Sequence, residues 1–465
     1  MEKESKVIFD ISDLKLKRLY DEAERKCLLN IKDFAGRSVL VEGGGYEKIW
    51  LETQPMGGEM YAKRNIKIGL NNQLMFMEYA REDGRIPGSI ALENGRVIPQ
   101  FNKFQGFCFP APALNMYYIA EEKTDYLDLL YTTLERFDDY LWKTRDSDND
   151  GCLESFCKYD TGEDHAVRYM DAPDAWTEEQ PPKDCRIVPM ASIDVMSYSY
   201  SSRETLSEIC RVLKKEELAD KWEKKAYAVR RKIREYLWSE ERGTCFDRDK
   251  NHFEIPVLYH NTLRAMYWHS IDDRMADAFV NRHLLNPDEF WTKMPLPSVA
   301  VNDSMFRNIE TNNWSGQCEA LTYQRAIRAL ENYGYDHLIP RLGKCLFDAL
   351  KEECRFVQQF DPFTGQISKV SLEGEIDAYG PAMLSVLEYI SRIYGVHRER
   401  EQLFWGCTNK SESIYEQHIG EHVYRVENTL TGSRAQIDGR EIFETKADVK
   451  IITNLNGDIQ RVIEL

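Results

Sequence analysis

The sequence lacks the cysteine patterns of a metal-bound or disulfide-stapled domain. Its eleven cysteines are odd in number and scattered, and no C-x-x-C pair occurs among them. This spacing argues against a zinc ribbon and against a thioredoxin-like redox site. We therefore expect reduced thiols and a cytoplasmic protein. The first ten residues mix acids and lysines without an apolar run, so we read no signal peptide there.

Long apolar runs and excess positive charge are also missing. No stretch approaches the roughly 18 apolar residues of a membrane helix. The 61 basic and 78 acidic residues give a net charge of −17, which argues against a nucleic acid or an anionic membrane as partner. No low-complexity linker and no fixed-period repeat occurs. The 465 residues suffice for a large core that needs no metal or disulfide.

Amphipathic helices account for most of what is present. Apolar residues recur at i, i+3, i+4 and i+7 in many segments, and long aromatic loops rich in proline and glycine separate them. About a dozen such helices, joined by alternating short and long links, predict a toroid of helical hairpins whose long loops enclose a cavity. The clearest predicted helices are residues 14–29, 61–81, 126–142, 193–213, 216–238, 263–269, 321–333, 337–350 and 381–394.

The pattern changes after residue 400. Short alternating segments punctuated by Thr-Gly, Asp-Gly and Asn-Gly turns predict a small β-sheet domain over residues 401–465. Residues 1–400 would then form the helical, catalytic domain. The predicted strands are residues 422–427, 434–437, 441–445, 449–453 and 459–463.

Two adjacent acids mark the first motif with chemical potential, residues 158–168 (KYDTGEDHAVR). Glu163 and Asp164 follow a glycine inside a loop. Neighbouring carboxylates repel, and burial near aromatic rings raises a carboxyl pKa, so both effects suit a general acid that must hold its proton at neutral pH. The alternative is a solvated acidic loop.

A second motif, residues 311–324 (TNNWSGQCEALTYQ), leads from an aromatic loop into a helix. It combines a flat ring with amide and carboxylate groups, which suits a sugar with its apolar face and rim of hydroxyls. The alternative is a helix cap with the tryptophan in the core. The candidate binding groups here are Asn313, Trp314, Gln317, Glu319 and Tyr323.

Two further segments resemble cavity walls. Residues 356–365 (FVQQFDPFTG) carry Gln358 and Asp361, although an ordinary Asp-Pro turn is the alternative. Residues 50–64 (WLETQPMGGEMYAKR) place a Gly pair before a helix, where glycine lets the chain turn. A structural turn is an equally good interpretation of this second segment. Its candidate binding residues are Trp50, Gln54, Tyr61 and Arg64.

Metal-binding patterns are weak. Asp146, Asp148 and Asp150 begin like a calcium loop, D-x-D-x-D-G, but position twelve is Cys157 rather than Glu, so a polar turn is the preferred interpretation. His418 and His422 match H-x-x-E-H, a zinc peptidase pattern that requires a helix, whereas this stretch contains Gly420 and enters the predicted β region. We expect no cofactor and no metal.

Taken in order, these motifs resemble those of the helical-toroid glycosidases that include glycoside hydrolase family 63, the trehalases and the mannosylglycerate hydrolases. The loop at residues 161–168 (TGEDHAVR) is similar to the family's S-G-W-D-N-S-P-R, residues 314–319 to W-R-G-x-x-W, and residues 145–154 to an R-D-x-D-x-D-G turn followed by an acid. Residues 358–365 (QQFDPFTG) are similar to E-N-Y-N-P-x-T-G. The resemblance covers roughly residues 10–395 and implies an (α/α)6 barrel.

The resemblance implies that Asp164 is the general acid of a glycosidase. Two departures matter. Glu163 replaces the Trp that precedes the acid, which predicts a more polar subsite floor. Gln358 replaces the family's catalytic Glu, and an amide cannot take a proton from water at neutral pH. The base therefore lies elsewhere, or turnover is absent.

The preferred hypothesis is an inverting glycoside hydrolase acting on a short oligosaccharide or glycoside, with Asp164 as acid and Glu319 as base. Glu319 is preferred because it lies in the cavity-lining Trp314 motif, and Gln358 would then hold the water or a hydroxyl. Arg168 joins the predicted sugar contacts. The other candidates for the base are Asp361, Glu373, Glu375 and Asp377.

Two alternatives keep the barrel. An inverting sugar phosphorylase needs no carboxylate base, because phosphate attacks, but it needs clustered cations such as Arg64, Arg168 and Arg307. A non-catalytic carbohydrate-binding protein would also tolerate the loss of the base. Phosphate-dependent turnover would identify the first alternative, and glycan binding without turnover would identify the second.

Overall fold

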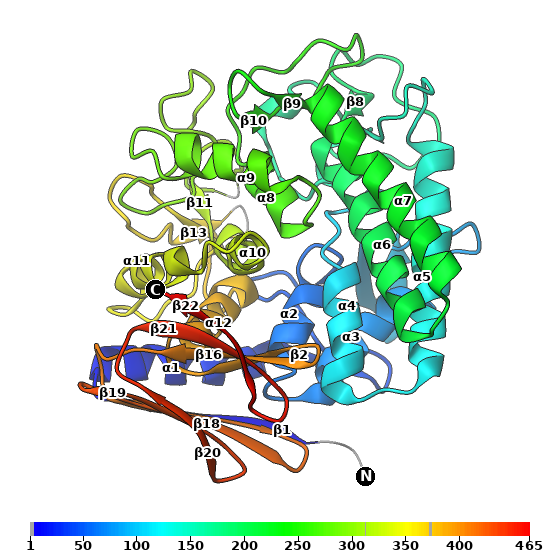
Figure 1. Cartoon of the computed structure of the whole chain (residues 1–465). Helices are drawn as coiled ribbons and strands as arrows, with labels where there is room; N and C mark the ends of the chain where they lie inside the picture. The colour runs from blue at the N-terminus through cyan, green and yellow to red at the C-terminus, as the bar shows by residue number, and fades with distance from the viewer. Residues whose placement is uncertain (1–3, 312, 372–373) are drawn as a thin grey trace.

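Six helices form a closed inner ring in the computed structural model, which describes residues 4–311, 313–371 and 374–465. Each helix of this ring packs against the next, and the last packs against the first (Figure 1). The inner helices are α2 (Gln54–Tyr61), α4 (Pro110–Ala120), α6 (Ile193–Val212), α8 (Asn261–Tyr267), α10 (Ala320–Glu331) and α12 (Gly380–Tyr394).

Six further helices pack against the outside of this ring. The described residues thus form six helical hairpins, and the predicted (α/α)6 toroid is confirmed. The outer helices are α1 (Leu14–Cys27), α3 (Ile66–Glu78), α5 (Thr124–Thr144), α7 (Glu216–Lys232), α9 (Asp273–Phe279) and α11 (Ile339–Leu350). No described helix is both long and apolar enough to cross a membrane.

Outer and inner helices differ in how they are buried. The outer helix α5 buries one apolar stripe, which includes Leu127, Leu134 and Leu141, and leaves its charged face exposed. The inner helix α12 is buried on every side over most of its length. Helix α4 differs from α12 in having no apolar stripe, since nearly all of its residues are apolar, and this is why no helical period identified it in the sequence.

The predicted helix at residues 61–81 corresponds to α3 (Ile66–Glu78), and α2 precedes it. Helix α2 ends at Tyr61, and α3 begins at Ile66 after a turn. Asn65 caps α3, because its side-chain oxygen accepts a hydrogen bond from the amide of Ile68 at 3.1 Å. The helix was therefore predicted correctly but with a start that is too early. The predicted turn at the Gly pair was wrong, because Gly57 and Gly58 lie inside α2.

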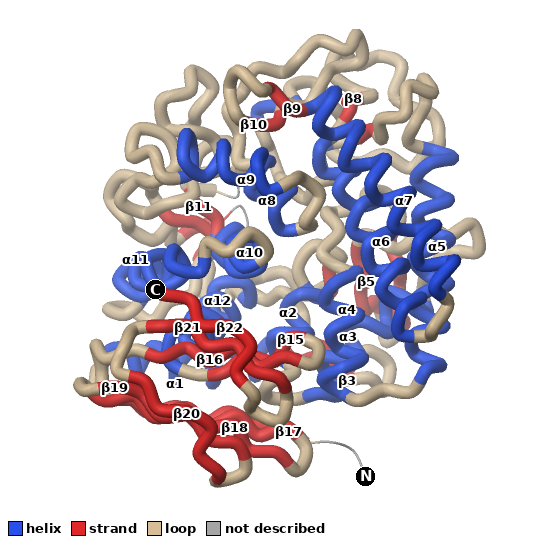
Figure 2. Tube along the Cα trace, viewed as in Figure 1, coloured by secondary structure: helices blue, strands red, loops and turns tan. Residues whose placement is uncertain are grey.

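The C-terminal region is a pair of antiparallel sheets (Figure 2). Trp405 packs its ring against Tyr424 and Phe443 of the other sheet, with centroids 6.3 and 5.9 Å apart. The first sheet has the order β15 (Val396–Glu399), β16 (Gln402–Cys407), β21 (Val449–Asn454) and β22 (Ile459–Glu464). The second has the order β1 (Ser5–Ile11), β17 (Ser413–Ile419), β18 (His422–Thr429), β19 (Gly432–Ile437) and β20 (Arg440–Thr445).

The division of the chain at residue 400 stays a prediction, but two strands that precede this residue belong to the C-terminal sheets. Strand β1, at the start of the chain, pairs with β17 over seven residues, and β15 precedes residue 400. The sheets thus take in the N-terminal strand, which the sequence pattern did not identify. All eleven cysteines are free, and all but Cys345 are buried.

Candidate active site

A cavity of about 240 Å³ lies where the loops before the inner helices meet. Four predicted site residues line it: Trp50, Asp164, Trp314 and Gln358. The cavity therefore brings together residues from all four of the sugar-binding motifs. The rest of its lining consists of Glu42, Tyr46, Glu52, Lys103, Gln105, Tyr159, Gly162, Leu321 and Tyr379.

Asp164 is held on the wall beside Trp314. The backbone amide of Trp314 donates a hydrogen bond to the carbonyl oxygen of Asp164 at 2.9 Å, and the Ser315 hydroxyl donates to the carbonyl of His165 at 2.8 Å. The Tyr259 hydroxyl in turn donates to the carbonyl of Trp314 at 2.7 Å. These bonds fix the loop of Asp164 to the loop that supplies the tryptophan ring.

Glu163, next to Asp164, does not line this cavity. It is fully buried and ion-paired to Arg168 and Arg264, and it lies 2.8 Å from the Nε2 atom of His260. Burial alone would raise its pKa, but Arg264 and Arg168 hold the pKa of Glu163 well below its usual range. The predicted polar subsite floor is therefore absent from this cavity wall, because Arg168 and Arg264 hold the carboxylate of Glu163 in the protein interior.

Arg168 completes that buried cluster. Its guanidinium also pairs with Asp194 at 2.6 Å and with Asp247. Arg264 pairs with Asp194 at 2.8 Å. Arg168 therefore anchors the loop of Asp164 to the N-terminus of α6, and the cavity lining does not include it.

Glu52 lies in the cavity wall and is bound by a cation. It is ion-paired to Arg325, and the side-chain amide of Gln105 donates to its Oε2 at 3.4 Å. Burial raises the pKa of Glu52 to about 7, although Arg325 and Arg264 lower it. A Cβ on Gly162, whose φ is +79°, would lie 2.2 Å from Glu52 Oε2, so glycine is needed there.

Glu42 and Gln358 share another part of the wall. The Tyr379 hydroxyl donates to Glu42 Oε1 at 3.1 Å, and the Tyr46 hydroxyl donates to Gln358 Oε1 at 3.3 Å. The two tyrosine rings meet edge to face, with centroids 6.4 Å apart. Burial, followed by repulsion from Glu52, raises the pKa of Glu42 well above its usual range.

Glu319, the base predicted from the sequence, lies close to these groups without lining the cavity. It is 1% exposed, and its Oε1 accepts a hydrogen bond from the Gln359 amide at 2.7 Å, across the short pair of strands β11 (Cys318–Glu319) and β12 (Gln359–Phe360). Burial raises the pKa of Glu319 well above its usual range.

A protein-family model for the mannosylglycerate hydrolase MGH1-like glycoside hydrolase domain matches residues 53–379, which include the loops that form most of this cavity. The chain belongs to this family. Comparison with the curated proteins finds no significant sequence match.

Solved structures share the fold of this MGH1-like chain. The GH63 mannosylglycerate hydrolase from Thermus thermophilus, in complex with glucose, superposes with a TM-score of 0.63 at 16% identity, over 80% of this chain and 100% of that one. Neutral trehalase Nth1 from Saccharomyces cerevisiae gives 0.55 at 14% identity, over 76% of this chain and 74% of that one. The α-L-rhamnosidase from Dictyoglumus thermophilum gives 0.60 at 12% identity, over 99% and 49%.

The other predicted binding residues of this MGH1-like chain do not line the cavity, and several of them have structural partners. Gln54 accepts from the amide of Trp50 at 2.6 Å, Arg64 pairs with Glu24 at 2.8 Å, and the Tyr323 hydroxyl donates to the carbonyl of Pro295 at 2.9 Å. Their local partners occupy the polar groups that the sequence assigned to sugar. The predicted residues outside the lining are Gln54, Tyr61, Arg64, Glu163, Arg168, Asn313, Gln317, Tyr323 and Asp361.

The alternative bases have structural partners or fall outside the description. Asp361 closes the predicted Asp-Pro turn, since its Oδ1 accepts from the amides of Phe363 and Thr364 at 2.9 and 2.7 Å. Asp377 pairs with Lys26 at 2.6 Å and does not line the cavity. Glu373 lies outside the described residues, as does the side chain of Glu375.

Sequence reasoning missed several lining residues. Glu42 precedes Gly43, Gly44 and Gly45, all with positive φ, and this glycine run was the available signal for a tight loop. Lys103 lies with its Nζ atom 4.9 Å from the ring centroids of both Trp50 and Tyr159. The sequence gives no sign of this contact, because Trp50 and Tyr159 are far from Lys103 along the chain and approach it only in the folded protein.

The candidate metal patterns fit structural roles. In the D-x-D-x-D-G segment, Asp148 and Asp150 accept hydrogen bonds from backbone amides within the loop, and Lys232 lies 3.5 Å from Asp150. These contacts match the predicted polar turn, although His252 also lies near both acids. His418 and His422 lie on paired strands β17 and β18, not on one helical face.

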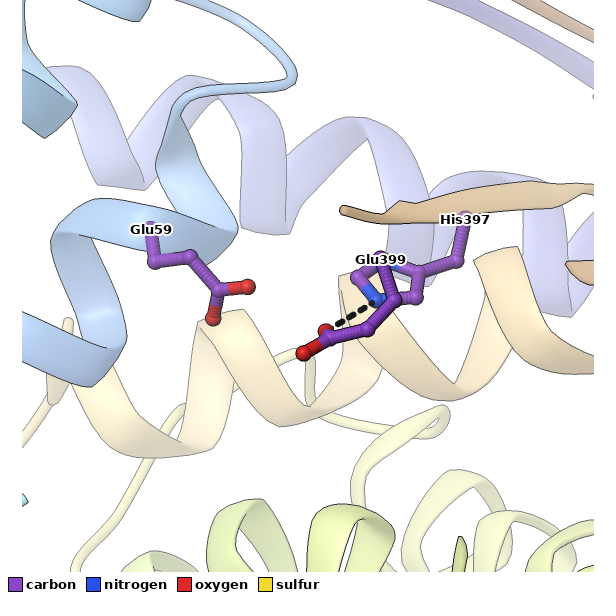
Figure 3. A group of neighbouring side chains, drawn as sticks. All are labelled: Glu59, His397 and Glu399. Atoms are coloured by element: carbon purple, nitrogen blue, oxygen red, sulfur yellow. Dashed lines mark hydrogen bonds and ion pairs between the residues drawn. The ribbon is translucent and has the colours of Figure 1, made fainter. Parts of the chain in front are cut away.

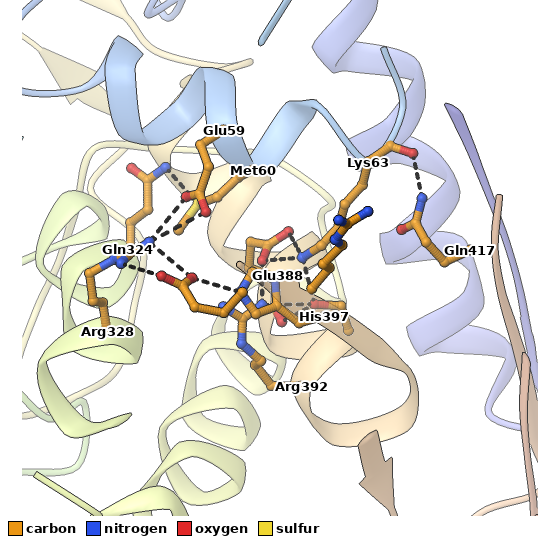
Figure 4. Close-up of polar contacts among 12 residues, drawn as sticks. Glu59, Met60, Lys63, Gln324, Arg328, Glu388, Arg392, His397 and Gln417 are labelled. Atoms are coloured by element: carbon orange, nitrogen blue, oxygen red, sulfur yellow. Dashed lines mark hydrogen bonds and ion pairs between the residues drawn. The ribbon is translucent and has the colours of Figure 1, made fainter. Parts of the chain in front are cut away.

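A second group, Glu59, His397 and Glu399, gathers three potential ligands between α2 and β15 (Figure 3). The Arg328 guanidinium already binds there, 3.3 Å from Glu59 Oε1 and 3.0 Å from Glu399 Oε1. Beside it, Lys63 and Arg392 pair with Glu388 (Figure 4). Because an arginine supplies the positive charge between the two carboxylates, this group is an ion cluster that ties β15 to the barrel.

Proposed function

We propose that this chain is an inverting glycoside hydrolase in which Asp164 is the general acid. The observation that carries the proposal is the position of Asp164 in a cavity that also contains the rings of Trp50 and Trp314 and two further carboxylates. Aromatic faces pack against the apolar face of a sugar, and carboxylates accept its hydroxyls. Membership of a glycoside hydrolase family supports the same class of reaction.

In this mechanism, Asp164 donates a proton to the glycosidic oxygen as the bond to the anomeric carbon breaks. A second carboxylate takes a proton from a water molecule, whose oxygen attacks the opposite face of the sugar ring. Inverting pairs lie about 6.5–9.5 Å apart, which leaves room for that water. Glu319 remains the base proposed from sequence, but it needs to release the Gln359 amide and reach the cavity.

The cavity also limits the substrate. Its volume of about 240 Å³ is below the roughly 300–1,000 Å³ of most ligand pockets, which favours one sugar ring at a time and hence cleavage at a chain end. Its acids favour a neutral or cationic sugar over an anionic one. The arginines that a phosphate site would need, Arg64, Arg168 and Arg307, do not line it, so hydrolysis is favoured over phosphorolysis.

A screen of aryl glycosides and disaccharides tests this function. We expect wild type to hydrolyse at least one of them without added phosphate, and Asp164→Asn to lose at least ~10²-fold in kcat. Asp174→Asn is the matched control, because Asp174 is a largely exposed acid of the same region, paired with Lys158. Binding without turnover by wild type, or full activity of Asp164→Asn, would overturn the proposal.

A further inference from the structure

Three carboxylates line the cavity, Glu42, Glu52 and Asp164. They differ in their neighbouring groups, and these differences suggest a different role for each. We propose that Glu42 is the general base of the reaction, an assignment that rests on the proposed hydrolase function. An inverting hydrolase needs one carboxyl group that gives a proton and one that takes a proton. With Asp164 as the acid, the base is one of the remaining two.

Glu52 is the weaker of these two candidates because a cation binds it. Arg325 forms a buried ion pair with it, in which both side chains are less than a tenth exposed. The Gln105 amide also donates to Glu52. If Glu52 accepted a proton, this ion pair would be lost and the charge of Arg325 would be left unpaired in a buried site.

Glu42 is held at the wall by its backbone and by one hydroxyl. The amide of Gly380 donates to its carbonyl at 2.7 Å, and the Tyr379 hydroxyl donates to Oε1 at 3.1 Å. No cation is paired with Glu42 among the described residues. The residue is 8% exposed and lines the cavity. Its contacts thus orient the carboxylate without neutralising it.

Gln358 lies on the same wall, where its side-chain amide could hydrogen-bond to the water molecule that the base activates. Tyr46, which donates to Gln358, packs against Tyr379, which donates to Glu42. A carboxylate can accept a proton from a water molecule whose position a neighbouring amide helps to fix. If Glu42 is the base, the reaction does not need a carboxylate at position 358, where this chain has a glutamine.

Glu319 fits the base less well than Glu42. It does not line the cavity and is 1% exposed, and the Gln359 amide occupies its Oε1. Repulsion from Asp164 contributes to the raised pKa of both Glu42 and Glu319. Access to the cavity, not charge, distinguishes them.

The roles of the two carboxyls are linked through their charges. Repulsion from Asp164 is one cause of the raised pKa of Glu42, so a protonated Asp164 favours the ionised form of Glu42. The reactive state has Asp164 protonated and Glu42 ionised. In the step, Glu42 takes a proton from water, the water oxygen bonds to the anomeric carbon, and the glycosidic C–O bond breaks. Its electron pair stays on the leaving oxygen, which takes the proton of Asp164; solvent exchange then resets both carboxyls.

The test compares Glu42→Gln, Glu319→Gln and wild type on a p-nitrophenyl and a 2,4-dinitrophenyl glycoside of the sugar that wild type cleaves. We expect Glu42→Gln to lose at least ~10²-fold in kcat on both substrates, because the attack on carbon needs the base whatever the leaving group. Asp174→Asn, which removes a largely exposed acid paired with Lys158, is the control and should stay within about fivefold of wild type. Glu319→Gln should lose less activity than Glu42→Gln. Thermal unfolding within a few degrees of wild type shows that the loss is not misfolding.

Other outcomes are equally decisive. Glu42→Asp keeps a carboxylate on a shorter side chain and should retain more activity than Glu42→Gln, a difference that a purely structural role of the glutamate would not produce. Activity of Glu42→Gln near that of wild type, or a large loss confined to Glu319→Gln, overturns the assignment of Glu42 while leaving the hydrolase intact. A wild-type protein that cleaves no glycoside overturns the proposed function and this inference with it.

Discussion

The backbone amide of Trp314 donates to the carbonyl oxygen of Asp164 at 2.9 Å. This bond joins two loops that are 150 residues apart in the sequence, and both of its residues line one cavity. In the proposed function, the half-buried Trp50 offers a face for the sugar beside the proton donor Asp164, whereas Trp314, 2% exposed, mainly supports the wall. The proposed chemistry depends on this arrangement, and the following experiments test its parts.

If Asp164 is the acid, its loss should matter less for a good leaving group. We expect Asp164→Asn to lose at least ~10²-fold in kcat on a p-nitrophenyl glycoside and much less on a 2,4-dinitrophenyl glycoside, whose phenolate leaves without a proton. Steady-state rates on the two substrates measure the difference. Equal losses on both would show that Asp164 does not protonate the leaving oxygen.

Gly162 should be required for the position of Glu52. Its φ is +79°, and a Cβ there would lie 2.2 Å from Glu52 Oε2. We expect Gly162→Ala to displace Glu52 and to lower kcat/KM by at least about tenfold, because small misplacements in a site are costly.

The matched control for Gly162→Ala is Gly365→Ala. Gly365 has a similar φ of +71°, but nothing lies within 4 Å of its would-be Cβ. This variant carries the same backbone strain, of order 1 kcal/mol, without the contact with Glu52. Equal activities of the two variants would show that the contact with Glu52 is unimportant.

The buried ion cluster should stabilise the protein far more than a surface pair does. Lys63 pairs with Glu388 where both side chains are less than a tenth exposed. We expect Lys63→Met to lower the free energy of unfolding by about 3 kcal/mol, because it leaves a buried carboxylate short of one partner. Lys344→Met, which breaks the exposed pair with Asp348, should cost at most about 0.5 kcal/mol. Urea unfolding of both variants gives the comparison, and similar costs would contradict it.

His397 should make the protein sensitive to acid. Burial, followed by the charges of Arg392 and Lys63, lowers the pKa of His397 to about 3, although Glu399 raises it. The unfolded chain, with a histidine pKa near 6.5, binds this proton first, so stability falls as pH drops below about 6.5.

The matching experiment follows the free energy of unfolding between pH 6.5 and pH 4.5. Wild type should lose about 2 kcal/mol more over this range than His397→Gln, which has no proton to bind. The amide of glutamine can still donate toward Glu399, which lies 3.3 Å from His397 Nε2. Parallel pH profiles would show that His397 is not buried in its neutral form.

The sequence predicted the barrel and part of the site for physical reasons. Outer helices such as α5 expose one charged face, so their period is visible, whereas α4 is apolar on nearly every side and has none. Asp164 and Trp314, which line the cavity, were singled out by the residue types of their motifs, and the resemblance to a known family implied the acid role of Asp164. Glu42 was missed because its partner Tyr379 lies 337 residues away, and Glu163 was misplaced because its cations come from other parts of the chain.

The most direct test of the central claim is the configuration of the first product. Proton NMR of the released sugar, recorded before it mutarotates, should show the anomer opposite to that of the substrate, because water attacks the face away from the leaving group. Release of the same anomer as in the substrate would mean a covalent intermediate on a cavity carboxylate, and it would contradict the roles of Asp164 as acid and Glu42 as base.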